Sequence, residues 1–188
     1  MAKVSSNDVK NGMKIEIDNE PYTIVSADFV KPGKGQAFTR TKLRHLISGR
    51  VIDRTFKSTD KLELADVEEK KMRFLYKEQE SIIFMDDRTY DQIEIPADAG
   101  EACRDWLLED LLYDIIFYKG SAVAITPPTF MELTITATDP GARGDTASGR
   151  VLKPATLETG AKVQVPIFIN EGEKIKVDTR TGEYVSRV

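Results

Sequence analysis

The sequence predicts an all-β protein made of three small barrels in series, with one short helix in the middle barrel. Short runs of alternating apolar and polar residues cover most of the 188 residues, and turns rich in Gly, Pro, Asn and Asp separate them. Hydrophobic residues make up 40% of the chain and charged residues 31%. This balance allows a buried core and excludes a chain that is disordered throughout.

Residues 1–64 are expected to form the first barrel. Apolar residues occupy every second position of 13–17, and an Asp-Asn-Glu-Pro turn follows at 18–21. Short strands joined by turns in this way are typical of a small antiparallel barrel. The strands expected here cover residues 13–17, 22–30, 38–47 and 51–57.

Residues 65–128 and 129–188 are expected to form two further barrels, each of five strands and of the OB type. The boundary between them is placed at Pro127-Pro128. The same periodicity also fits one larger sandwich. In the middle segment we expect strands at 70–77, 81–87 and 89–96, a helix near 101–108, and two apolar strands joined at Lys119-Gly120. In the last segment we expect strands at 130–138, 161–169, 174–179 and 182–188.

Charge is distributed unevenly along the chain. The three segments carry net charges of +4, −8 and 0, which together give the formal −4. Within the first segment, residues 29–61 hold nine Lys and Arg against two Asp, a net +7. Such asymmetry indicates a module that faces nucleic acid on an otherwise acidic body, although a solvated surface gives the same pattern.

Several classes of function are excluded by composition. Cys103 and His45 are the only residues of their types, so zinc sites and CxxC redox motifs are absent and no metal or cofactor is expected. Cys103 lies on the apolar face of the expected helix and is interpreted as buried, whereas His45, at the end of a cationic strand, is expected to be exposed. The longest apolar run, Leu111 to Tyr118, contains Asp114 and is too short to span a membrane. The start of the chain has no apolar targeting segment, so we expect a cytoplasmic protein.

The stretch from Val30 to Gln36, VKPGKGQ, is the most informative motif. Glycine on both sides of Lys34 permits positive φ and leaves a long cation exposed at a hairpin tip. The motif lacks the spacing of a P-loop or a dinucleotide-binding loop. It therefore offers reach and positive charge, or it is a solvated turn.

A row of cations follows this motif. Arg40, Lys42 and Arg44 alternate along one strand, so they share one face about 6.6 Å apart, while Thr39, Thr41 and Leu43 face the core or a neighbouring strand. Arg54 and Lys57 of the next strand are candidates to extend this face. Such cations would contact phosphates without reading sequence, and a solubilising surface is the alternative.

The last segment contains a loop from Asp139 to Arg150 that is rich in glycine and small polar residues. Such a loop can lie close to an RNA backbone, and it can equally be an ordinary connection.

Together these pieces closely resemble the bacterial elongation factor P family over essentially the whole chain. The resemblance rests on FVKPGKGQAFTRTKLRHL, on DPGxxGDTA at 139–147, and on residues 153–188 nearly throughout. It implies an SH3-like, KOW-type barrel followed by two OB-type barrels, arranged in an L that resembles tRNA. Members of this family bind the ribosome between the peptidyl-tRNA and exit sites and restart peptide-bond formation at consecutive prolines.

The resemblance also implies roles for particular residues. Lys34 matches the tip residue that approaches the CCA end of the peptidyl-tRNA, and a modifying enzyme extends this lysine by β-lysylation in many members. Gly144, Asp145 and Thr146 match the part that meets messenger RNA in the exit site. The implied protein is a monomer without enzymatic activity that acts on the 70S ribosome and does not contact a membrane. The residues implied to bind tRNA are Lys31, Pro32, Gly33, Lys34, Gly35, Arg40, Lys42, Arg44, Arg54 and Lys57.

The chain departs from the family pattern at Arg150-Val151-Leu152, where relatives often carry Gly, Asn or Thr, and at His45, where Asn or Arg is commoner. Two other functions are alternatives. A generic single-stranded RNA-binding OB protein would use exposed aromatic residues for stacking, and none is evident in the sequence. An enzyme acting on nucleic acid would need paired carboxylates or a histidine-based site, which the sequence does not offer.

Overall fold

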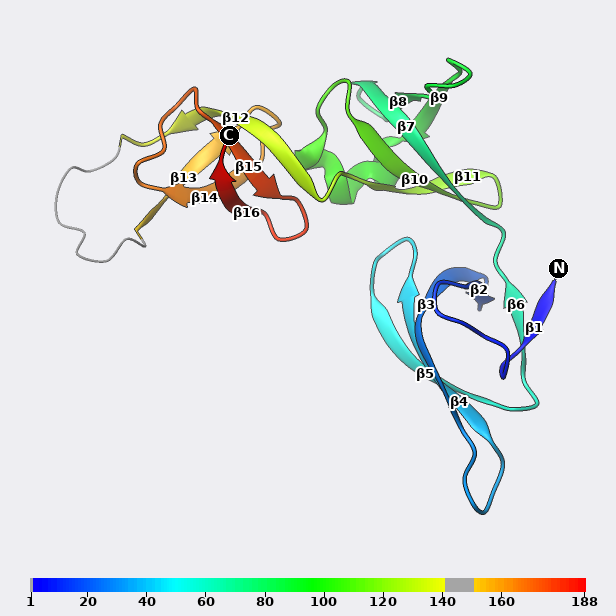
Figure 1. The fold of residues 1–188 in the computed structure, drawn as a ribbon. Coiled ribbons are helices and arrows are strands. Elements are labelled where there is room, and N and C mark those ends of the chain that lie inside the picture. Colours follow the sequence, from blue (N-terminus) through cyan, green and yellow to red (C-terminus); the bar gives the residue numbers. More distant parts are fainter. Residues whose placement is uncertain (1, 141–150) are drawn as a thin grey trace. The chain divides into compact units, whose positions relative to one another are not determined.

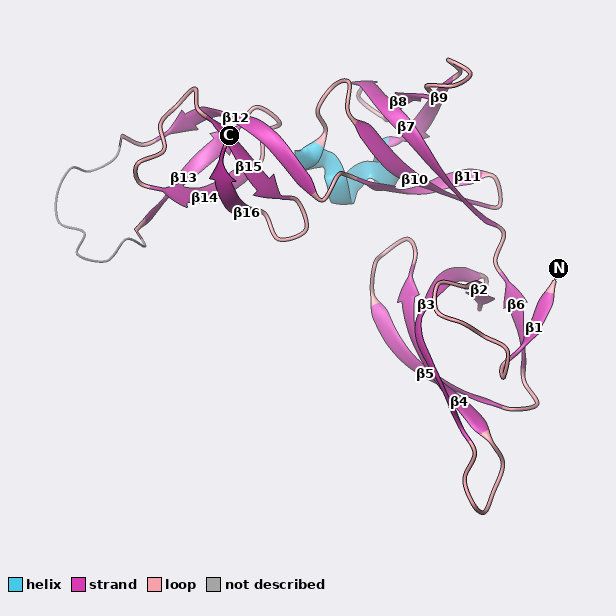
Figure 2. Cartoon of the chain, viewed as in Figure 1, coloured by secondary structure: helices cyan, strands magenta, loops and turns pink. Residues whose placement is uncertain are grey.

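The computed structural model describes residues 2–140 and 151–188, and within them it is built of β-strands with one short helix (Figures 1 and 2). The N-terminal strands form a six-stranded sheet in the order β1-β6-β2-β3-β4-β5. Their bounds are β1 Lys3–Ser5, β2 Lys14–Ile17, β3 Glu20–Val30, β4 Phe38–His45, β5 Val51–Lys57 and β6 Lys61–Leu64.

The middle strands form a five-stranded sheet in the order β11-β10-β7-β8-β9, with a 3-10 helix, η1, after β9. The bounds are β7 Val67–Lys77, β8 Ser81–Met85, β9 Gln92–Pro96, η1 Ala97–Trp106, β10 Leu112–Tyr118 and β11 Ser121–Thr126. The helix was expected at 101–108 but covers Ala97–Trp106, and Gly100 lets it lie against β8. A Cβ added at Gly100 would come within 2.3 Å of Ile82 Cδ1.

The last strands form a second five-stranded sheet in the order β14-β13-β12-β15-β16. All pairings in it are antiparallel. Separate sheets for the middle and last segments confirm two barrels over the alternative of one larger sandwich. The bounds are β12 Phe130–Thr138, β13 Leu152–Leu157, β14 Lys162–Pro166, β15 Lys174–Asp178 and β16 Glu183–Arg187.

The chain divides into two compact units. One contains Met1–Lys70 and Ile115–Ala124, and the other contains Lys71–Asp114 and Ile125–Val188. The turn between β10 and β11, with the parts of both strands next to it and the start of β7, therefore groups with the N-terminal barrel, and the remainder of the middle sheet groups with the second unit. The boundaries expected at residues 64 and 128 remain predictions.

Each sheet buries its own apolar face. Ile15, Ile24 and Leu43 are fully buried in the N-terminal barrel, while Leu133 and Val165 are fully buried in the C-terminal barrel. In the middle sheet the rings of Phe74, Phe84 and Tyr113 pack together, with centroids 5.7 to 6.1 Å apart. The period-two alternation of the sequence is thus the alternation between core and solvent.

Replacing Tyr113 by phenylalanine is expected to lower the free energy of unfolding by about 1–3 kcal/mol. The Tyr113 hydroxyl is buried, donates to the carbonyl of Trp106 at 2.6 Å and accepts from the amide of Leu108 at 2.9 Å. Burial raises the pKa of Tyr113 to about 12, so the hydroxyl stays neutral. Without it, the Leu108 amide loses its acceptor. Urea denaturation measures the effect, with the exposed Tyr76→Phe as the control; equal stability of the two variants would contradict the assignment.

Candidate nucleic-acid interface

The long hairpin of β3 and β4 presents the candidate tip residue. Its strands pair from Tyr22 with His45 to Val30 with Phe38, and the loop that joins them projects beyond the strands (Figure 1). Lys34 is exposed in this loop, as the sequence indicated. Of its two flanking glycines, only Gly35 has a positive φ, at 108°, so Gly35 is the one that the turn requires.

The rest of the candidate loop lies around this lysine. Lys31, Gly33 and Gly35 are exposed, and Pro32 is partly buried, with its Cγ 3.9 Å from where a Cβ on Gly35 would stand. The base of the loop is held by the next turn of the barrel, because the amide of Ser58 donates to the carbonyl of Ala37 at 3.0 Å. A fixed base and an exposed tip are what a reaching side chain needs.

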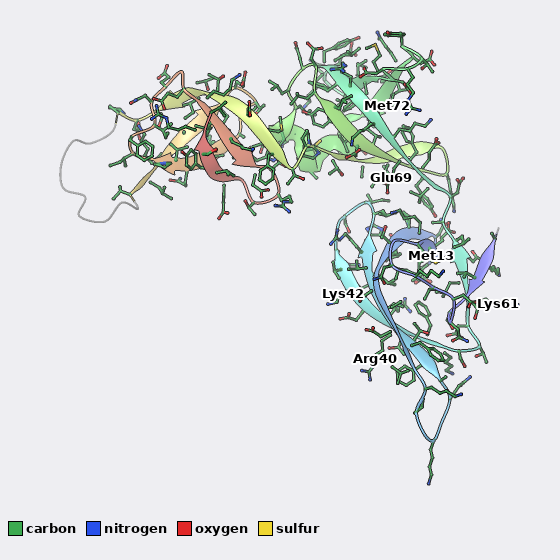
Figure 3. All side chains as sticks on the ribbon, viewed as in Figure 1. Met13, Arg40, Lys42, Lys61, Glu69 and Met72 are labelled. Carbon is green, nitrogen blue, oxygen red and sulfur yellow. The ribbon has the colours of Figure 1, made fainter. Side chains whose placement is uncertain are left out.

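The cations of β4 occupy one face of the N-terminal barrel. Arg40, Lys42 and Arg44 are exposed, whereas Thr39, Thr41 and Leu43 between them are buried, which confirms the expected alternation. The two buried threonines satisfy their hydroxyls by donating to the backbone carbonyls of Ser6 and Arg54. Figure 3 shows Arg40 and Lys42 on the same side of the barrel, with Lys61 on the other side. One strand therefore packs inward and presents charge outward.

Two acidic residues border this face: Asp53, which the net charge of residues 29–61 already counts, and Asp28, which lies just before that segment. In the strand register Arg40 lies opposite Asp28 of β3, and Lys42 lies opposite Asp53 of β5. The Arg40 guanidinium also lies 5.4 Å from the centroid of the Phe38 ring. The alternation of inward and outward residues along β3 and β5 could have shown that these two acids face outward. The face remains net positive, but less so than the strand alone indicates.

The two candidates on β5 are placed differently. Lys57 pairs with Phe38, and Thr55 pairs with Arg40, so Lys57 shares the face of the β4 cations. Arg54 is opposite the buried Thr41, and its guanidinium lies 3.5 Å from the carboxylate of Asp18. The structure thus brings Lys57 to the cationic face and directs Arg54 away from it.

His45 is buried, not exposed as the sequence analysis expected. It follows Leu43 on the inward side of β4 and is 8% exposed. Its Nδ1 lies 2.7 Å from Ser48 Oγ, its Nε2 lies 3.3 Å from the carboxylate of Glu20, and its ring centroid is 5.0 Å from that of Tyr22. Alternation along β4 accounts for the difference: His45 supports the β4–β5 turn.

The other candidate residues lie in the segment that runs from the end of β12 to the start of β13. Gly144, Asp145, Thr146 and Arg150 lie outside the described residues, whereas Val151 and Leu152 are exposed. Within residues 2–140 and 151–188 no group of three or more His, Cys, Asp or Glu side chains is placed to hold a metal ion. No helix in that part of the chain is long and apolar enough to cross a membrane.

A β-barrel with a cationic face and a projecting lysine, followed by two further β-barrels, defines a modular protein of the kind that faces nucleic acid. Family models agree over nearly the whole chain: the KOW-like domain of elongation factor P (EF-P) matches residues 5–62, the OB domain of EF-P matches residues 67–125, and the elongation factor P C-terminal model matches residues 131–187.

Known relatives extend over the same length. "Elongation factor P 2" from Protochlamydia amoebophila (strain UWE25) is 62% identical over 188 residues, covering 100% of this chain and 99% of the relative. "Elongation factor P" from Caldanaerobacter subterraneus subsp. tengcongensis is 49% identical over 185 residues, covering 98% and 100%. In fold, the chain is similar to eukaryotic translation initiation factor 5A from Methanococcus jannaschii, with a TM-score of 0.52 and 24% identity over 67% of this chain and 92% of that one.

The chain belongs to the elongation factor P family. It is accordingly a translation factor that works with the ribosome and tRNA in the cytoplasm and is not an enzyme. The resemblance found in the sequence and the all-β architecture of one KOW-like and two OB domains are confirmed.

Proposed function

We propose that this factor binds the ribosome between the peptidyl-tRNA and exit sites and stimulates peptide-bond formation at consecutive prolines. The observation that supports this proposal most is the exposed Lys34 at the end of the long β3–β4 hairpin, in a chain that is similar to elongation factor P over its full length. Lys34 is the residue proposed to reach the CCA end of the peptidyl-tRNA.

The mechanism is positional. Proline is a constrained nucleophile, and a peptidyl-tRNA whose acceptor end moves loses the geometry in which the reacting atoms are about 3 to 3.5 Å apart. A cation held on a long hairpin beside the CCA backbone restricts that movement. The ribosome performs the chemistry, and the factor contributes no reacting group.

The β4 cations are proposed to bind the tRNA body. Arg40, Lys42 and Arg44 contact its phosphates, together with Lys57 at the edge of the same face, and Lys31 to Gly35 surround the acceptor end. Because phosphate contacts release counterions, this binding weakens as salt rises. Asp28 and Asp53 limit the net charge and so limit unspecific binding to other RNA.

Lys34 is also the proposed modification site. A lysine-modifying enzyme that adds β-lysine would lengthen the side chain and add a cation, and its exposed position in a projecting loop is accessible to such an enzyme. The intact mass of the protein purified from its native host tests this: an added mass that maps to Lys34 supports the modification, and an unmodified mass contradicts it.

The C-terminal barrel is proposed to contact messenger RNA in the exit site through Gly144, Asp145 and Thr146, with the factor acting as a monomer on the 70S ribosome. This assignment rests on the DPGxxGDTA resemblance at residues 139–147.

A reconstituted translation reaction tests the proposal. Synthesis of a peptide with three consecutive prolines is timed with and without the factor, and a message without prolines serves as the control. Acceleration confined to the proline message is expected. No acceleration, combined with tight binding to free single-stranded RNA in a filter assay, would instead support a general RNA-binding protein.

A further inference from the structure

Two hairpin turns that are far apart in the sequence lie together in the N-terminal unit. One is Asp18-Asn19 between β2 and β3, and the other is Lys119-Gly120 between β10 and β11. All four residues have positive φ, between 50° and 82°, as two-residue type I′ turns require. Both turns belong to the same compact unit.

Side chains join the two turns around the carboxylate of Glu16. The Tyr118 hydroxyl donates to Glu16 Oε2 at 2.5 Å, and Lys119 Nζ lies 3.2 Å from the same oxygen. Lys119 Nζ also donates to Asn19 Oδ1 at 2.7 Å. In the backbone, the Lys119 amide donates to the carbonyl of Asp66 at 3.0 Å. We call Glu16, Asn19, Tyr118 and Lys119 the Glu16 cluster.

The cluster is built to remain ionised at neutral pH. The Glu16 side chain is only 8% exposed, whereas that of Lys119 is 37% exposed, so the carboxylate is shielded from water and the ammonium is partly in contact with it. The hydrogen bond from Tyr118 holds the pKa of Glu16 below its usual value, with Lys119 acting in the same direction. The hydrogen bond to Tyr118 and the carboxylate of Glu16 raise the pKa of Lys119. Opposite charges therefore persist on both sides of the contact.

Neither hairpin needs these side-chain contacts in order to form. β2 and β3 already pair directly from Lys14 with Thr23 to Ile17 with Glu20, and β10 and β11 are hydrogen-bonded neighbours in their own sheet. Burying a carboxylate costs free energy that the contacts must offset. The specific effect of the cluster is thus to fix one turn against the other.

The Glu16 cluster lies at the start of the strand that leads to the Lys34 loop. β3 starts at Glu20, directly after the first turn, and runs to Val30, directly before the loop that carries Lys34. Eleven residues of strand reach about 33 Å at roughly 3.3 Å per residue, so a rotation of one degree at the base moves the far end by about 0.6 Å. A positioned group loses effect when it is misplaced by about 0.5 to 1 Å.

We infer that Glu16, Asn19, Tyr118 and Lys119 are positioning residues that hold the base of the Lys34 hairpin and thereby set where the lysine acts. This inference rests on the proposed function for its effect on translation, and on the contacts alone for its effect on the hairpin base. The residues do not touch the tRNA in this account and act through Lys34.

Charge reversal tests the inference. Lys119→Glu and Glu16→Lys are each expected to speed hydrogen exchange of the residue 119 amide by roughly fivefold or more, after correction for the intrinsic rate of the new side chain, because a turn no longer held by its side chains lets this amide leave the carbonyl of Asp66 more often. The Ile24 amide, bonded to the carbonyl of Met13 inside the barrel, should exchange as before. The double variant, which restores opposite charges, should recover slow exchange. Lys119→Gln, which removes the charge without reversing it, is the second variant in case Glu16→Lys does not fold.

The same variants are then assayed on the three-proline message. We expect the maximal rate to fall in each single variant and to recover in the double variant, while the concentration for half-maximal effect changes less than about threefold, because the phosphate-binding face is intact. Unchanged exchange in the single variants would overturn the cluster as a restraint, and faster exchange with an unchanged rate would overturn its positioning role. If the unaltered protein itself gives no acceleration, the proposed function fails and the exchange result still decides the restraint.

Discussion

Replacing Lys34 by alanine is expected to reduce peptide-bond formation at consecutive prolines to the rate measured without the factor. Lys31, Pro32, Gly33 and Gly35 are proposed to surround the acceptor end, but only the Lys34 side chain is proposed to restrict its movement, so truncating Lys34 should remove the positional effect. The measurement is the rate of synthesis of a three-proline peptide at a saturating concentration of the variant. Residual acceleration of more than about a tenth of the full effect would mean that another residue supplies the restraint.

The control for this prediction is Lys61→Ala, an exposed lysine of β6 on the other side of the same barrel (Figure 3). It changes the net charge equally and should keep full activity. Neither substitution should alter the thermal midpoint, because changes at exposed positions away from packed contacts rarely exceed about 0.5 kcal/mol. A loss of stability in Lys34→Ala would instead point to a structural role for the loop.

Replacing Arg40 and Lys42 together by serine is expected to raise the concentration needed for half-maximal acceleration by at least about tenfold near physiological salt. The two cations face solvent together on β4. Removing two phosphate contacts should also flatten the logarithmic dependence of binding on salt by about 1.5. Titration of the variant at several salt concentrations measures both effects.

A matched double variant, Arg54→Ser with Lys61→Ser, removes one arginine and one lysine from the same barrel. The Arg54 guanidinium lies beside the carboxylate of Asp18, and its strand position is opposite the inward Thr41. Lys61 lies on the other side of the barrel from the β4 cations (Figure 3). The salt dependence of this control should stay close to that of the unaltered protein. Equal losses in the two double variants would show that only net charge matters and would contradict a defined tRNA-binding face.

Much of the N-terminal barrel could be predicted from the sequence, because period-two alternation is strong there. It gave the inward Thr39, Thr41 and Leu43 and the outward cations of β4, and the flanking glycines indicated an exposed Lys34. The same alternation, continued from Leu43 to the next inward position of β4, would have placed the His45 side chain inside the barrel. The position of His45 beside Arg44 suggested a continued cationic surface, and that suggestion was wrong.

Other elements were hidden for identifiable physical reasons. β1 and β6 are three and four residues long, too short to show a period. β13 carries Lys153 at an inward position, followed by Pro154, so its pattern does not read as a strand. In the structure Lys153 is buried and its ammonium donates to the carbonyl of Asp139 at 2.6 Å.

The Glu16 cluster could not have been predicted, because it depends on two turns about a hundred residues apart. Each turn alone looks like an ordinary polar hairpin connection. Only the assembled unit shows that the Tyr118 hydroxyl and the Lys119 ammonium reach the same carboxylate. The outward direction of Asp28 and Asp53 could be read from the alternation of their strands, but their place beside Arg40 and Lys42 depends on the register between strands.

A cleavage reagent attached at position 34 tests whether the Lys34 tip reaches the acceptor end of the peptidyl-tRNA. The only natural thiol, Cys103, is buried, and burial raises its pKa to about 11, so a Lys34→Cys variant carries one reactive cysteine for an iron chelate. On ribosomes stalled at consecutive prolines, hydroxyl radicals generated at this site should cut the peptidyl-tRNA at its 3′ acceptor end. Cleavage confined to other RNA, with the acceptor end intact, would contradict the account.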